Sequence, residues 1–226
     1  MKSFTVLRAS AFRGLKPQLF ETVAPLELIE GVKRKYEFLK FPSLERANEP
    51  FDFQVGKMKH GSRVLKIDQF VVSYIGTEAT SIGAASRTSS NDADLFLDDL
   101  IDWFSKEFDL DVSIRFPSAY HSQAEFVLSE KARLSNRLKE LSELGKGITN
   151  IVRSYGSAKC PEFEVSTLAM HFDLTDTSLP KPIATPFSFE RRVGTSYDEN
   201  KYFSQAPLKT QDHKAVLEQL EKILLA

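Results

Sequence analysis

The sequence predicts an α+β fold with a mostly antiparallel sheet of about 6–9 strands and three main helices, at about 91–108, 130–155 and 211–225. Two observations predict this class. Short alternating or β-branched runs are joined by turns, which is typical of antiparallel hairpins. Three longer segments carry apolar residues at helical spacing. We expect the 226 residues to form a single α+β domain (1–226).

The composition limits the classes of function. An apolar fraction of 42% and a charged fraction of 27% are ordinary for a soluble globular protein, while 18 Phe against one Trp indicate a Phe-rich core or interface. Because the net charge is only −1, an overall attraction to nucleic acid is not indicated. The single cysteine, Cys160, excludes an internal disulfide and a multi-cysteine zinc site. With no hydrophobic signal core and no apolar run long enough for a membrane span, we expect a cytoplasmic protein without a membrane partner.

The N-terminal part predicts several short elements. Residues 3–10 alternate as a strand, and a short helix is expected over 26–33, after Pro25. Residues 35–41 predict a strand stopped by a proline. The segments 51–58 and 63–74 flank a Gly-containing turn and predict an antiparallel hairpin.

The core is expected to centre on residues 69–108, a strand–loop–helix unit. A β-branched run is followed by a small, polar stretch (77–90), predicted as a loop, and then by the first main helix. The apolar stripe of this helix consists of Ala93, Leu97, Leu100, Ile101, Phe104 and Phe108. Ser90 or Asn91 is the expected N-cap.

Two features of this helix suggest a bound ligand, but a helix cap explains the first better and a solvent-exposed helix face explains the second better. Arg87 and Ser89 precede the helix start, where a phosphate could bind, but the aspartates of the first turn repel an anion and a plain cap is favoured. Asp94, Asp98 and Asp102 have a spacing that a metal could use, yet they lie beside or opposite the apolar stripe and no His accompanies them. We expect no metal and no cofactor.

The C-terminal part predicts a linker containing Pro117, a strand at 124–128 and the second main helix. This helix carries a heptad-like row made of Leu134, Leu138, Leu141, Gly145, Ile148 and Val152. Packing on the sheet is favoured for it, and self-association through the helix around Leu134–Val152 is the alternative. Further strands are expected at 162–173, 187–193 and, as a short edge strand, 201–205. Thr210 is expected to cap the last helix, and no internal repeat is visible.

No segment carries a catalytic motif, and no resemblance to a known family is close enough to name. The segment GKGIT (145–149) lacks the preceding Gly and strand of a phosphate-binding loop. His171 and Asp173 lie on one face of a predicted strand and, with Arg191 and Arg192, give a hydrolase-type alternative.

Two clusters are candidate binding sites. Lys33, Arg34 and Lys35 precede aromatic residues up to Phe41, a pattern found where single-stranded nucleic acid binds. The densest group of Arg and Tyr, the residue types that dominate protein interfaces, consists of Arg191, Arg192, Tyr197 and Tyr202. The leading hypothesis is a non-enzymatic protein that acts through protein–protein contacts, as a homo-oligomer or a subunit of a larger complex.

Overall fold

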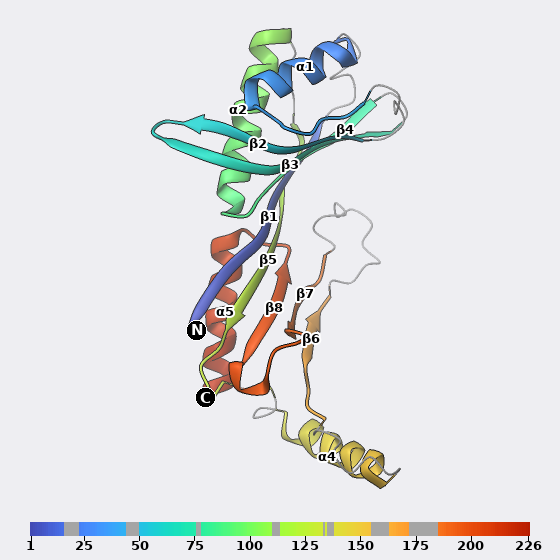
Figure 1. The fold of residues 1–226 in the computed structure, drawn as a ribbon, viewed down its shortest axis with the longest axis vertical. Helices are drawn as coiled ribbons and strands as arrows, with labels where there is room; N and C mark the ends of the chain where they lie inside the picture. Colours follow the sequence, from blue (N-terminus) through green and yellow to red (C-terminus); the bar gives the residue numbers. More distant parts are fainter. Residues whose placement is uncertain are drawn as a thin grey trace.

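A computed structural model describes residues 1–15, 23–43, 50–75, 78–109, 114–132, 134, 138–154, 163–171 and 185–226 (Figure 1). The strands are β1 (Ser3–Leu15), β2 (Phe51–His60), β3 (Arg63–Ile75), β4 (Glu78–Ser86), β5 (Ile114–Val127), β6 (Thr167–Met170), β7 (Phe187–Arg191) and β8 (Lys201–Ala206). The helices are α1 (Pro25–Tyr36), α2 (Ser90–Phe108), α4 (Lys139–Ser154) and α5 (Thr210–Leu225), with a short 3₁₀ helix η2 (Tyr197–Glu199).

The described strands form one antiparallel sheet in the order β2-β3-β4-β1-β5-β8-β7-β6. The predicted α+β class, sheet type and number of strands are therefore confirmed. The long strands β1 and β5 pair at the centre of the sheet and join its two ends (Figure 1).

The topology contains an internal duplication that the sequence does not show. The first half runs β1-α1-β2-β3-β4-α2 and the second β5-α4-β6-β7-β8-α5. When β1–β4 are matched with β5–β8, the sheet order is the same from either edge. The expectation that the chain has no repeat is wrong at this level.

The two halves meet symmetrically at the first residues of α2 and α5. The Ser90 N–H donates to Thr210 Oγ1 at 2.9 Å, and the Thr210 N–H donates to Ser90 Oγ at 2.9 Å. The prediction that Thr210 caps its own helix is therefore wrong. The N-cap of α5 is Lys209, and the Thr210 hydroxyl accepts a hydrogen bond from the first turn of α2 instead. The N-cap of α2 is Ser89, whose side chain accepts from the Asp92 N–H at 3.1 Å.

The helices α1, α2 and α5 bury their apolar faces on one side of the sheet. In the first half, α1 and α2 cover strands β1–β4 over an aromatic cluster made of Tyr36, Phe38, Phe53, Phe70 and Phe96. In the second half, α5 covers a smaller core that includes Phe126, Phe189, Tyr202 and Leu217. No described helix covers the opposite face, which we call the open face; antiparallel sheets tolerate such a face in water.

Several predicted boundaries are wrong because pairing between distant strands overrides local sequence. The expected loop at 77–90 contains β4, which pairs with both β1 and β3. The expected linker around Pro117 belongs to β5, and Pro117 lies at an irregularity opposite β1, beyond the part of β5 that pairs with β8. The segment 201–205 is not an edge strand, because β8 lies between β5 and β7. Of the strand expected at 162–173, β6 covers four residues, and 172–173 lie outside the described residues.

The second predicted helix is shorter than expected. Helix α4 begins at Lys139, and Leu134 packs in the second-half core instead of continuing its row. Gly145 has a packing role: a Cβ at this position would lie 2.3 Å from the Phe163 carbonyl oxygen. The chain at 163–166 approaches α4 at this glycine, where the Phe163 N–H donates to Thr149 Oγ1 at 2.9 Å. The rejection of a phosphate-binding loop at Gly145 is consistent with this helical packing.

Candidate functional site

Helix α1 places three cations at its C-terminal end. Pro25 fits the first turn because it needs no N–H partner, and Lys33, Arg34 and Lys35 occupy the last turn, where positive charge favours the helix dipole. Of the strand predicted at 35–41, only an isolated antiparallel bridge between Lys40 and Gln54 is present, because the helix continues to Tyr36. The Tyr36 ring is 1% exposed and extends the apolar face of α1. Glu37 then ends the helix in a left-handed conformation.

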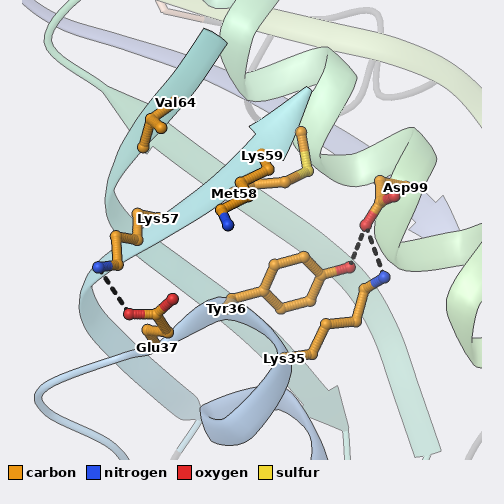
Figure 2. Close-up of a pocket in the computed structure, with 8 residues that line it drawn as sticks. All are labelled: Lys35, Tyr36, Glu37, Lys57, Met58, Lys59, Val64 and Asp99. Carbon is orange, nitrogen blue, oxygen red and sulfur yellow. Dashed lines mark hydrogen bonds and ion pairs between the residues drawn. The ribbon is translucent and has the colours of Figure 1, made fainter. Parts of the chain in front are cut away.

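A pocket of about 410 Å³ lies between this helix end and the β2–β3 hairpin (Figure 2). Its lining residues are Lys35, Tyr36, Glu37, Lys57, Met58, Lys59, Val64 and Asp99. The buried Tyr36 and Met58 form its inner wall, and Lys59 lies near Met58 on the hairpin side of the Tyr36 ring (Figure 2).

Two ion pairs flank the pocket on opposite sides of the Tyr36 ring (Figure 2). Lys57 Nζ lies 2.6 Å from Glu37 Oε2, and Lys35 Nζ lies 3.0 Å from Asp99 Oδ2. The Tyr36 hydroxyl donates to the same Asp99 oxygen at 2.8 Å. Burial, and next this hydrogen bond, raise the pKa of Tyr36, so the ring stays a neutral donor.

The pocket belongs to a larger cationic surface, which we call the basic edge because β2 is an edge strand. Its members are Lys33, Arg34, Lys35, Lys40, Lys57, Lys59, Arg63 and Lys66. Half of them pair with Glu30, Asp99, Glu37 and Asp92. Arg34, Lys40, Lys59 and Lys66 are exposed, and none of the four has an ion-pair partner among the described residues. The basic edge therefore keeps an excess of positive charge although the whole chain is nearly neutral.

The strand register places three of these lysines on the side of the hairpin away from its buried residues. Gly56, Met58 and Leu65 face the core side, so Lys57, Lys59 and Lys66 project from the other side of the hairpin. Lys57 and Lys66 lie directly opposite each other in the ladder. Like charges at such a position destabilise a sheet, so this pair favours a function that uses the charge.

The hairpin cations do have a signal in the sequence. The residues 53–67 contain no Asp or Glu, although they contain four Lys or Arg. The hairpin itself was predicted, but nothing in one dimension showed that it lies against the end of α1. The sequence pattern therefore predicts only the cations within Lys33–Phe41 and not those of the hairpin.

The predicted Arg and Tyr cluster separates into surface and core residues. Arg191 donates to the Ser196 carbonyl at 2.7 Å, and Arg192 pairs with Glu125 at 2.9 Å. Tyr202 is buried between Phe126 and Phe189, so this residue cannot contact a partner at the surface. The side chain of Tyr197 lies outside the described part of the structure.

The phosphate alternative before α2 gains no support. Ser89 is used as the helix cap, and the exposed Arg87 lies 3.7 Å from Asp68. Nearby, the buried Asp92 accepts hydrogen bonds from Thr88 and Arg63, which adds negative charge at the helix start. A cap is the role that the geometry assigns to Ser89.

The residues proposed for a hydrolase site do not converge where the structure describes them. His171 follows the end of β6, whereas Arg191 lies at the other end of the β6–β7 ladder, next to Ser166. Five residues of strand separate these positions, which is about 16 Å. Asp173 and Cys160 lie outside the described residues. Within the described ranges no group of His, Cys, Asp and Glu could hold a metal ion.

Helix α4 presents the second surface of note. Leu141, Leu144, Ile148 and Ile151 have exposed fractions between 37% and 59% and follow one another in steps of three, four and three. They form one exposed apolar stripe, which we call the α4 row. Its counterpart in the duplication, α1, buries its apolar face against α2, whereas α4 lies at the far end of the molecule from α1 (Figure 1).

Comparison with known proteins adds little. No protein family and no curated protein sequence matches the chain. Among solved structures, Methanococcus jannaschii TBP is similar over 98% of this chain and 97% of that chain, with 11% sequence identity and a TM-score of 0.43. A likeness at this level carries no inference about function. Among the described helices, none has the length and apolar character needed to cross a membrane.

Proposed function

We propose that this protein binds single-stranded nucleic acid through the basic edge. The observation that carries the proposal is the group of four cations, Arg34, Lys40, Lys59 and Lys66, that no described carboxylate neutralises. Phosphates would supply the missing counter-charge. The neighbouring Phe41 ring is 42% exposed and has Lys33 Nζ 4.0 Å from its centre, so a base could stack beside a cation.

The test measures oligonucleotide binding against salt concentration. Replacement of Arg34, Lys59 and Lys66 by alanine is expected to reduce the slope of log K against log salt by about 2, since each lost phosphate contact removes about 0.7 for a single strand. The affinity at low salt should fall by at least about tenfold. Fluorescence anisotropy with a labelled single strand measures both quantities.

A matched control removes the same charge elsewhere. Lys106, Lys139 and Lys222 are exposed and have no ion-pair partner among the described residues. Their replacement by alanine should leave the slope unchanged. Equal losses in the two triple variants would mean that only overall charge matters, and the basic edge would not be the site.

We propose self-association through the α4 row as a second function, which the exposure of its four apolar side chains favours. Two such rows can pack together and remove these side chains from water. Because the row is short, the dimer is expected to be weak and to form at about 100 µM protein. Sedimentation analysis should show a dimer for the natural chain and a monomer for the Leu144→Lys/Ile148→Lys variant. A monomer for the natural chain at this concentration would contradict the proposal.

A further inference from the structure

The pocket in the basic edge has an inner end. Tyr36 and Met58, which are 1% and 4% exposed, close it toward the core. Because this inner wall is buried, a ligand enters from the solvent side, and a phosphate at the end of a strand can reach it with fewer neighbouring nucleotides in the way than an internal phosphate. The pocket volume of about 410 Å³ is within the range of pockets that hold small ligands.

One lysine of the pocket is left unbalanced, which favours a phosphate there, and its three N–H donors favour a phosphate with three free oxygens. The lining contains the ammonium groups of Lys35, Lys57 and Lys59 and the carboxylates of Glu37 and Asp99. The two carboxylates pair with Lys57 and Lys35, and Lys59 is the lysine whose charge no described residue balances. A phosphomonoester carries a charge of about −1.5 to −2 and three acceptor oxygens, against −1 for a diester.

The two ion pairs also position the cations. Glu37 holds Lys57 on one side of the pocket, and Asp99 holds Lys35 and the Tyr36 hydroxyl on the other (Figure 2). Lys59 lies between these pairs with its three N–H donors unused by any described acceptor. A terminal phosphate placed here would have both hairpin lysines, Lys59 and Lys57, in the wall around it.

We propose that the pocket binds the terminal phosphate of a single strand, with Lys59 as the main contact. This inference rests on the proposed nucleic-acid binding and specifies its ligand: a strand that ends in a phosphomonoester. The neighbouring cations, such as Lys66, lie outside the pocket and serve internal phosphates.

The experiment compares three oligonucleotides of one sequence, with a 5′-phosphate, a 3′-phosphate or two hydroxyl ends, in a binding titration. One phosphorylated form is expected to bind about tenfold more tightly than the hydroxyl form, because it gains charge-assisted hydrogen bonds. The Lys59→Ala variant should lose this preference. The Lys66→Ala variant should bind all three more weakly and keep the preference, which makes it the matched control.

Each other outcome has a defined meaning. Equal affinities of the natural chain for the three strands would overturn the terminal-phosphate site while leaving the proposed nucleic-acid binding intact. A preference that survives in Lys59→Ala would overturn the role of this pocket. If none of the strands binds at low salt, the proposed function itself fails. A nucleoside monophosphate that displaces the phosphorylated strand at equal concentration would show that the pocket takes a free nucleotide and not a strand end.

Discussion

Replacing Gly56 by alanine is expected to lower the free energy of unfolding by about 2 to 3 kcal/mol. A Cβ at this position would lie between 2.4 and 2.7 Å from three atoms of the Phe38 ring. That ring is 3% exposed and is enclosed by Phe53, Phe70 and Phe96, whose ring centres lie 5.4 to 6.4 Å away. Because these neighbours are also buried, the Phe38 ring has no free space into which it could move. Urea unfolding measures the loss.

A second substitution separates this clash from other effects. Phe38→Ala alone should cost about 3 to 5 kcal/mol, since it leaves a cavity in the aromatic cluster. With the ring removed, alanine at position 56 meets no obstacle, so the double variant should be about as stable as Phe38→Ala. Strictly additive losses would contradict this mechanism.

A glycine in open space provides the comparison. A Cβ at Gly147, inside α4, would have no atom within 4 Å. Gly147→Ala should therefore stabilise the helix by up to about 1 kcal/mol. The same chemical change thus has opposite expected signs at Gly56 and Gly147.

The helices were the most predictable elements, because their signal is local. The stripe expected for 91–108 contains four residues that are fully buried in α2: Ala93, Leu97, Leu100 and Phe104. The helix predicted at about 211–225 is also present, as α5, which begins at Thr210. In both cases the apolar spacing of the segment itself predicts the buried face.

The strands that were missed depend on distant partners. β4 is rich in small residues, and a Cβ at Gly83 would lie 2.6 Å from the ring of Phe12, its neighbour across the ladder. Gly83 must be small because the Phe12 ring of β1 packs against it, and this contact exists only when β1 and β4 are paired. The sequence of β4 alone therefore resembles a loop.

The same reason limits what could be predicted about the site. The cations at the end of α1 were identified, but the pocket also needs Lys57 and Lys59 from the hairpin and Asp99 from α2. Their convergence is a property of the tertiary packing. The duplication is similar, since it relates the topology of two halves with no repeat visible in their residues.

The protein is expected to lose stability in weak acid because of His213. This residue is fully buried in α5, and burial, together with the nearby charge of His121, lowers the pKa of His213 to about 4. Its Nε2 lies 2.8 Å from Ser204 Oγ, and the Ser204 hydroxyl donates its hydrogen bond to the Ser188 carbonyl. A second proton would enter at Nδ1, which has no hydrogen-bond partner in the described structure.

The sign follows from the two pKa values. In the unfolded chain the pKa of His213 is near 6.5, so between about pH 6.5 and 4 the unfolded state binds the proton and the folded state does not. The stabilisation by the neutral ring is complete above pH 6.5 and is lost as the pH falls toward 4, up to about 3 kcal/mol. His121, whose pKa is lowered by burial and by Arg8, contributes in the same direction.

Unfolding measured by urea at several pH values should therefore show a fall in stability between pH 6.5 and 4 that is much smaller in His213→Phe. Phenylalanine keeps the edge contacts with Phe4 and Phe187, and Ser204 keeps its bond to Ser188, so the variant should fold. The exposed His60 provides a control for the loss of a histidine, in the variant His60→Gln. If His213→Phe loses as much stability in acid as the natural chain, the acid sensitivity arises from other groups, His121 first among them.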